Sequence, residues 1–265
     1  MLDAGKQISA LMRRVRQQGG LPSSTEIVRE TFERLGYVRG AIEPEEAVAR
    51  FNELLRNVWE ETLVTLERHE ERSYREGIPR ELLAAYPAEL SAAEQVAREE
   101  GFRTGVIYLF GRWYPHLRNA FLSVSQSRKT RGGKDFELQI ESLLDLASIS
   151  YHKQETRNRT DLILPSLEVH MANRTISVVV SVKRTLRERW AEVAEELFNL
   201  RSPNVFLFTA DENVSENHVT RICGRYNIYL VVWDALKAAK FPDSPLVLGY
   251  TEWATRRLAV LRQNW

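Results

Sequence analysis

The stretch Ile176-Ser-Val-Val-Val-Ser-Val-Lys183 decides the fold, because it is rich in β-branched residues and reads as a strand. Side chains alternate between the two faces of a strand, so one face carries Ile176, Val178, Val180 and Val182 into a core. The opposite face carries Ser177, Val179, Ser181 and Lys183. A lysine that ends an apolar strand is usually just a solvated strand end, unless other charged groups gather around it.

The segments around this strand predict an α/β core with a mixed sheet. Further strands are expected at 149–153, 161–164, 204–209 and 228–233. Helices are expected at 135–146, 187–200, 215–226 and 251–262. The predicted order is therefore helix, three strands, helix, strand, helix, strand, followed by a last helix.

The first hundred residues read as helices. Apolar spacing, a serine cap at Ser24 and a capping box of Ser91 with Glu94 predict helices over 3–17, 24–35, 44–76 and 91–101. Gly77-Ile78-Pro79 is expected to break the third helix, and Pro115 to kink or divide another at 105–123. We expect a helical N-terminal region over 1–101, for dimerisation or DNA-backbone contacts, and a second domain over 102–265.

Composition excludes several classes of protein. The chain has 265 residues and a single cysteine, which excludes a disulfide framework and a cysteine-rich zinc site. No apolar run reaches the length of a membrane span and no signal peptide is recognised, so we expect a soluble, cytoplasmic protein. The five histidines lack metal-ligand spacing, and no glycine-rich phosphate loop predicts a nucleotide cofactor.

The near-neutral total of 37 basic against 36 acidic residues hides a segregation of charge. Residues 41–100 contain 15 Glu and 7 Arg, whereas residues 101–134 contain seven basic residues and no acidic one. This asymmetry indicates a polyanionic partner more than the total does, although it also fits a solvated basic face.

Three charged side chains are placed to meet at one edge of the sheet. Asp161 begins the strand before Lys183, and Glu196 lies on the helix that follows. Two carboxylates beside a lysine suit Mg²⁺-assisted hydrolysis of a phosphodiester, in which the ion polarises the phosphate and the ammonium stabilises charge or orients water. The alternative for Glu196 is an ordinary exposed helix glutamate.

The order and spacing of four short segments resemble the site of PD-(D/E)xK type II restriction endonucleases. The segments are Thr160-Asp161, Ser181-Val182-Lys183, Arg187-Glu188-Arg189 and Glu196. The likeness is to the CCGG group, in its SsoII, PspGI and EcoRII branch, where Ser-x-Lys replaces the acidic-x-Lys motif. A second likeness covers Ser127 to Glu137, whose glutamate lies near the metal in that family. One departure is Thr160, which stands where the founding motif has proline.

The resemblance implies a Mg²⁺-dependent enzyme that cuts double-stranded DNA at a short palindromic CCGG- or CC(N/W)GG-like site, and a homodimer. It implies metal ligation by Asp161, Glu196 and Glu137, with Lys183 catalytic and Ser181 supportive. Arginine can donate to guanine and glutamate can accept from cytosine, so base reading is expected from Arg187, Glu188 and Arg189. Phosphate contacts are expected from Arg128, Lys129, Arg131 and Lys134.

Three alternatives stay open. A repair or Holliday-junction nuclease could use the same core, although it would not need a base-reading triplet beside its lysine. A non-catalytic DNA-binding protein is the second, with Ser181 marking a decayed site. An α/β domain without any nucleic-acid role is the third. The Gly132-Gly133 pair could let the backbone approach DNA or merely start a helix.

Overall fold

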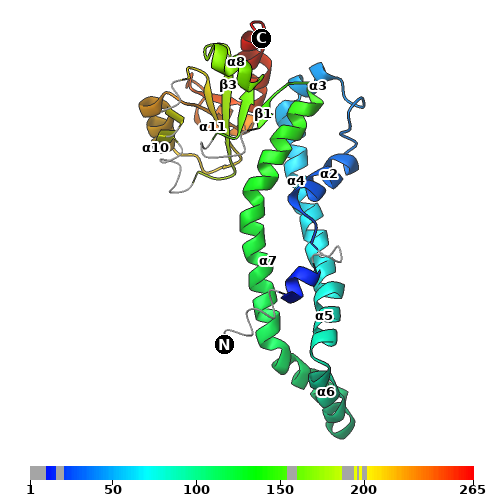
Figure 1. Ribbon diagram of the computed structural model, residues 1–265. Helices are drawn as coiled ribbons and strands as arrows, with labels where there is room; N and C mark the ends of the chain where they lie inside the picture. Colours follow the sequence, from blue (N-terminus) through cyan, green and yellow to red (C-terminus); the bar gives the residue numbers. More distant parts are fainter. Residues whose placement is uncertain (1–9, 16–20, 154–159, 187–193, 196, 199–201) are drawn as a thin grey trace. The chain divides into compact units, whose positions relative to one another are not determined.

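A computed structural model describes residues 10–15, 21–153, 160–186, 194–195, 197–198 and 202–265 (Figure 1). The chain forms two compact units. Unit 1 combines Met1–Ile27 with Thr62–Arg131, and unit 2 combines Val28–Glu61 with Gly132–Trp265. These limits differ from the division expected after residue 101, and the role expected for the N-terminal helices stays a prediction.

A six-stranded mixed sheet forms the middle of unit 2, which confirms the predicted fold class. The strands lie side by side in sequence order. The second strand is antiparallel to the first and to the third, and the third to the sixth are parallel to one another. They are β1 (His152–Lys153), β2 (Leu162–Leu164), β3 (Val178–Lys183), β4 (Val205–Thr209), β5 (Tyr229–Val232) and β6 (Val247–Gly249). The three-residue β6 is not among the strands that the sequence predicts, because so short a run has no visible period.

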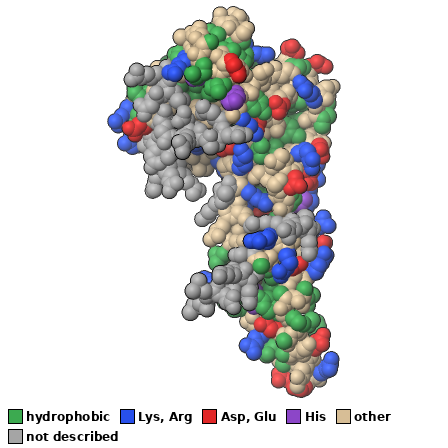
Figure 2. Space-filling model, in the orientation of Figure 1, with side chains coloured by type: hydrophobic (Ala, Val, Ile, Leu, Met, Phe, Trp, Pro, Cys, Tyr) green, Lys and Arg blue, Asp and Glu red, His purple; other side chains and the backbone are tan. Residues whose placement is uncertain are grey.

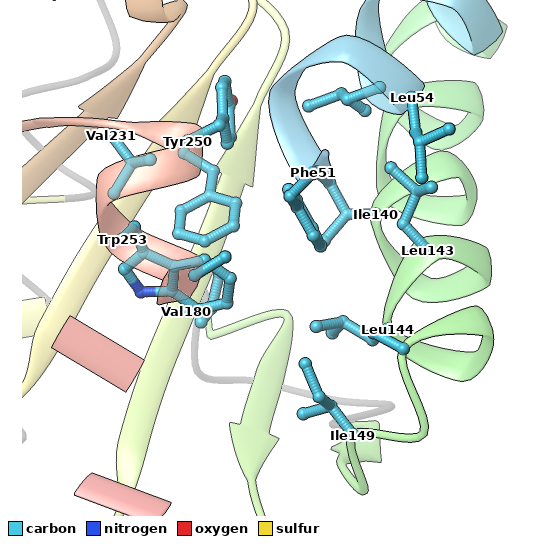
Figure 3. Close-up of a cluster of buried hydrophobic side chains, with 14 of the residues drawn as sticks. Phe51, Leu54, Ile140, Leu143, Leu144, Ile149, Val180, Val231, Tyr250 and Trp253 are labelled. Atoms are coloured by element: carbon cyan, nitrogen blue, oxygen red, sulfur yellow. The ribbon is translucent and has the colours of Figure 1, made fainter. Parts of the chain in front are cut away.

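Both faces of β3 are buried. Val178, Val180 and Val182 pack into one hydrophobic cluster, as the alternation predicts, and Val179 packs into a second cluster on the other face. Figure 3 shows part of the first cluster, where Ile140 and Leu143 of α7 lie across from Val180 of the sheet. Aromatic rings from other helical segments, at Phe51, Tyr250 and Trp253, complete the layer. β3 is therefore covered on both sides, whereas both residues of the edge strand β1 are exposed.

Short helices connect the strands of unit 2 or follow the last of them. Ser166 caps the first of them by accepting a hydrogen bond from Val169 N at 3.3 Å. These helices are α8 (Leu167–Ala172), α10 (Glu216–Val219), η2 (Thr220–Arg225), α11 (Asp234–Lys240), α12 (Tyr250–Glu252), η3 (Trp253–Arg257) and α13 (Leu258–Arg262). Most of the helix expected at 187–200 lies outside the described residues.

The N-terminal part of the chain is helical, as predicted. Its helices are α2 (Ser24–Arg34), α3 (Pro44–Ala49), α4 (Phe51–Arg72), η1 (Ser73–Gly77), α5 (Ile78–Ala85) and α6 (Pro87–Glu100). The predicted break at 77–79 is wrong, because a π-helical turn leads directly into α5 and Pro79 lies in its first turn, where a missing N–H is tolerated. The start at Ser91 is also wrong, because α6 begins at Pro87.

The long helix α7 (Phe102–Leu146) replaces the two helices predicted at 105–123 and 135–146. Pro115 lies inside it, and the glycine pair at 132–133 does not start a new helix. Apolar side chains along α7, such as Ala120 and Val124 in unit 1 and Phe136 in unit 2, are buried, so packing outweighs these local signals. Among the described helices, none is both long enough and apolar enough to cross a membrane.

Candidate active site

The ends of β2 and β3 bring the predicted aspartate and lysine together. The main-chain N–H of Asp161 donates to Val180 O at 3.0 Å, which fixes the residue at the start of β2. Its Oδ2 then accepts hydrogen bonds from Ser181 Oγ at 3.1 Å, Val182 N at 2.6 Å and Lys183 Nζ at 3.0 Å. The expected meeting of Asp161 with Lys183 is thus present in the geometry of the sheet.

These contacts define the electrostatics of the strand ends. The side chains of Lys183 and Asp161 are 29% and 20% exposed, so their charges lie at the border between the core and solvent. All three donors bind Oδ2 of Asp161, and none of the three binds its Oδ1. A carboxylate held in this way can offer one oxygen to a ligand without changing its orientation.

Ser181 lies where the usual motif has a second acidic residue. Its side chain is fully buried, and its hydroxyl donates to Asp161. A carboxylate at this position would lie beside that of Asp161, and two like charges at such a distance oppose each other's ionisation. The serine instead supplies a neutral donor that supports the aspartate.

The last part of α7 adds a second set of charges. Lys134 Nζ donates to Glu137 Oε2 at 3.0 Å. Partial burial lowers the pKa of Lys134, but the hydrogen bond to Glu137 and the negative charges of Glu137, Glu141 and Asp161 outweigh it and raise this pKa. Lys134, the partner of Glu137, therefore lies within electrostatic reach of Asp161, and the predicted place of Glu137 near a metal stays a prediction.

Sequence reasoning missed an ion pair between the buried Glu141 and the exposed Lys153. Lys153 Nζ lies 2.5 Å from Glu141 Oε2, whose side chain is only 8% exposed. Burial raises the pKa of Glu141, although the hydrogen bond to Lys153 opposes this effect. A detectable signal was present, since Glu141 follows Glu137 by one helical turn and is flanked by the apolar stripe of α7.

Two of the basic residues predicted to contact DNA have hydrogen-bond partners within unit 1. Arg128 Nε donates to both carboxylate oxygens of Glu70 at 2.7 Å, and Arg131 Nη2 donates to Leu21 O at 3.4 Å, both within unit 1. The hydrogen bond to Glu70 raises the pKa of Arg128 against the opposite effect of burial. The predicted residues Arg187, Glu188, Arg189 and Glu196 and the side chain of Lys129 lie outside the described residues.

Arg184, directly after the site lysine, occupies a space that exists because Gly132 has no side chain. A Cβ on Gly132 would overlap Nη1 of Arg184 and lie 3.0 Å from its Cζ. The guanidinium also lies over the ring of Trp59, with Cζ 5.1 Å from the ring centroid. Neither reading of the glycine pair made from sequence describes this contact, which no local pattern could indicate.

Within the part of the chain that the structure describes, no group of three His, Cys, Asp or Glu side chains is arranged to hold a metal ion. Glu196, the predicted third carboxylate, is not in that part. The predicted ligand set of Asp161, Glu137 and Glu196 therefore stays a prediction.

The fold is similar to that of restriction endonucleases of known structure. Residues 116–245 match the family model described as EcoRII C terminal. The type II restriction enzyme SsoII of Shigella sonnei is 30% identical over 151 residues, which cover 52% of this chain and 49% of that relative. The chain thus spans about half the length of this curated relative.

Two solved structures share the fold. Metal-depleted Ecl18kI in complex with uncleaved DNA matches with a TM-score of 0.80 at 22% identity, over 99% of this chain and 86% of that one. The PspGI–substrate DNA complex matches with a TM-score of 0.59 at 18% identity, over 91% and 94%. The resemblance to the SsoII, PspGI and EcoRII branch that the motifs indicate is thereby confirmed.

Proposed function

We propose that this chain is a type II restriction endonuclease that cuts both strands of DNA at a short palindromic site resembling CCGG or CC(N/W)GG. The observation that carries the proposal is the triple hydrogen bonding of Asp161 Oδ2 at the ends of β2 and β3, with Lys183 Nζ at 3.0 Å. The likeness to SsoII, Ecl18kI and PspGI supports the choice of reaction.

The residues present fit a hard divalent cation such as Mg²⁺, which prefers oxygen ligands. The three donors hold Oδ2 of Asp161 and do not contact its Oδ1. Glu137 and Asp161 both act electrostatically on Lys134, which supports Glu137 as the source of a second carboxylate. We propose these two and Glu196 as the ligands. When bound, the ion would polarise the phosphate and favour hydroxide formation.

The protein's own groups then have distinct roles. Lys183 places an ammonium beside Asp161, where it can orient the attacking water or stabilise charge on the phosphate. Ser181 keeps Asp161 in position. We propose base reading by Arg187, Glu188 and Arg189 and phosphate contacts by Arg128, Lys129, Arg131 and Lys134. Two copies on a palindrome make a homodimer the expected assembly, acting in the cytoplasm.

The test is digestion of DNA of known sequence with Mg²⁺, followed by sequencing of the fragment ends. We expect cleavage at one short palindrome. Asp161→Ala and Lys183→Ala should each lower the rate at least about a hundredfold. Both variants should still bind the site in a gel-shift assay without Mg²⁺. Asp243→Ala and Lys240→Ala remove the same charges outside the site and should cleave like the wild type.

Each alternative has its own outcome in the same experiment. Specific binding without cleavage would identify a non-catalytic DNA-binding protein. Cleavage of branched or damaged DNA at no fixed sequence would identify a repair or junction nuclease. A chain with no salt-dependent DNA binding at all would have no nucleic-acid role.

A further inference from the structure

Asp211, two residues after β4, uses both of its carboxylate oxygens to hold main-chain N–H groups. Its Oδ2 accepts from Leu186 N at 2.8 Å, and its Oδ1 accepts from Asn213 N at 2.9 Å. On the face in Figure 2, carboxylates and basic side chains lie next to one another along the helices. Asp211 differs from such surface carboxylates, because its partners belong to the backbone. It therefore ties the chain after β4 to the chain after β3.

The end of β4, from which Asp211 follows, is itself held from the core. Tyr250 Oη donates to Thr209 O at 3.0 Å, and Trp233 Nε1 donates to Ala210 O at 3.1 Å. Both of these aromatic side chains are buried. The main-chain N–H of Asp211 also donates to Thr209 Oγ1 at 3.1 Å. Because buried rings hold this backbone, the core of unit 2 sets the position of Asp211.

The other end of the bond lies three residues after the site lysine. Lys183 is the last residue of β3, and it pairs with Thr209 in the parallel ladder. Strand ends open easily where a ladder stops. Directly beyond this end, the hydrogen bond from Leu186 to Asp211 joins the two chains again. Leu186 is also buried, in the second hydrophobic cluster. The segment from Lys183 to Leu186 is thus held at both of its ends.

We infer that Asp211 is a positioning residue of the nuclease site, which keeps Lys183 aligned with Asp161 by clamping the segment that follows the lysine. This inference rests on the proposed function, because Lys183 has a catalytic role only if the chain cleaves DNA. A displacement of about 1 Å at a catalytic group can lower a rate about a hundredfold. Lys183 keeps its own hydrogen bond to Asp161, so the loss of Asp211 should cost less than the loss of the lysine.

The test is the single-turnover rate of DNA cleavage by the full chain, with saturating enzyme and well below the melting temperature. Asp211→Ala should lower this rate about tenfold or more. Asp211→Asn keeps a carbonyl oxygen that can accept from Leu186 N, so its rate should lie within about threefold of the wild type. Asp211→Glu keeps the charge but moves both oxygens by one methylene, and it should also lower the rate. The test therefore does not depend on Asp211→Ala remaining folded.

Ser166→Ala is the matched control for a loss of stability. It removes another side-chain oxygen that accepts from a main-chain N–H in unit 2, at the start of α8. The variant should lower the melting temperature, as the loss of a helix cap does, and leave the cleavage rate unchanged. A role of Asp211 in stability alone would give Asp211→Ala the same pair of results.

Deuterium exchange of the Leu186 amide proton reports the clamp without any cleavage. Asp211→Ala should speed this exchange about tenfold or more, because a hydrogen bond to a charged acceptor is lost, and Ser166→Ala should not.

The outcomes separate the two proposals. If the wild type cleaves and neither Asp211→Ala nor Asp211→Glu lowers the rate, the positioning role is refuted and the nuclease stands. A rate that Asp211→Asn lowers as much as Asp211→Ala also refutes the role. If the wild type does not cleave, the nuclease is refuted. The exchange of the Leu186 amide then decides whether Asp211 clamps the segment.

Discussion

The two adjacent glycines of α7 offer a direct test of how the site is built. Gly132 lies against the guanidinium of Arg184, whereas a Cβ on Gly133 would meet nothing within 4 Å. Both are in the interior of the same helix. Gly132→Ala and Gly133→Ala therefore add the same methyl group, one residue apart, in opposite surroundings.

The expected difference follows from the structure. Replacing glycine by alanine in a helix interior stabilises it by about 0.8–1.0 kcal/mol, and Gly133→Ala should show this gain in full. Gly132→Ala gains the same amount but displaces the guanidinium from Trp59, losing a cation–π contact of about 0.5–1 kcal/mol. Crowding adds about 1–3 kcal/mol. The Gly132 variant should therefore be the less stable by about 1.5–4 kcal/mol, the sum of these two losses.

Thermal unfolding measures this difference, because 1 kcal/mol shifts Tm by about 2–4 °C in a chain of this size. The Tm of Gly132→Ala should lie roughly 3–16 °C below that of Gly133→Ala. In an Arg184→Ala background the obstacle is gone, so both alanines should stabilise equally. Equal melting temperatures in the wild-type background, or a difference that persists without Arg184, would refute the reasoning.

Three further perturbations address charges and hydrogen bonds. Arg128→Ala should lower the free energy of unfolding in urea by about 3 kcal/mol, because it leaves the buried carboxylate of Glu70 without its partner. The control, Arg118→Ala at an exposed arginine, should lower it by less than about 0.5 kcal/mol. Burial raises the pKa of Glu141 above the ordinary 4.5, so its contribution to stability is present below that pH and falls as pH rises through the folded-state pKa. Stability measured from about pH 4 to pH 7 should therefore shift in favour of Glu141→Gln; an unchanged difference contradicts this. Ser181→Ala removes one hydrogen bond worth about 1 kcal/mol and should slow single-turnover cleavage less than about tenfold, so complete inactivation would show a larger role.

The sheet and the pairing at its edge could be predicted from the sequence. The alternation in 176–183 depends only on neighbouring residues, and the core confirms it at Val178, Val180 and Val182. The meeting of Asp161 with Lys183 follows from two strands that are adjacent in sequence and antiparallel. Contacts between strands that follow one another in the sequence can therefore be predicted from the strand pattern and the residue spacing.

Contacts between distant elements could not be predicted. Pro115 and the glycine pair predict breaks in α7 because the sequence shows residues that disfavour a helix interior. The packing that outweighs this local preference cannot be seen in the sequence. Arg128 and Glu70 are 58 residues apart, and nothing around either residue indicates the other. The sequence could therefore suggest a phosphate contact by Arg128, which stays a prediction, but not its ion pair with Glu70.

The hydrogen bonding of Asp161 has a consequence for handling the protein. An ammonium, a hydroxyl and a main-chain N–H already balance its carboxylate within the folded chain. The strand ends thus do not depend on a cation for their shape, unlike structural metal centres whose loss unfolds the protein. A chelator should therefore stop the proposed cleavage while leaving the melting temperature unchanged, and returning Mg²⁺ should restore activity without a refolding step.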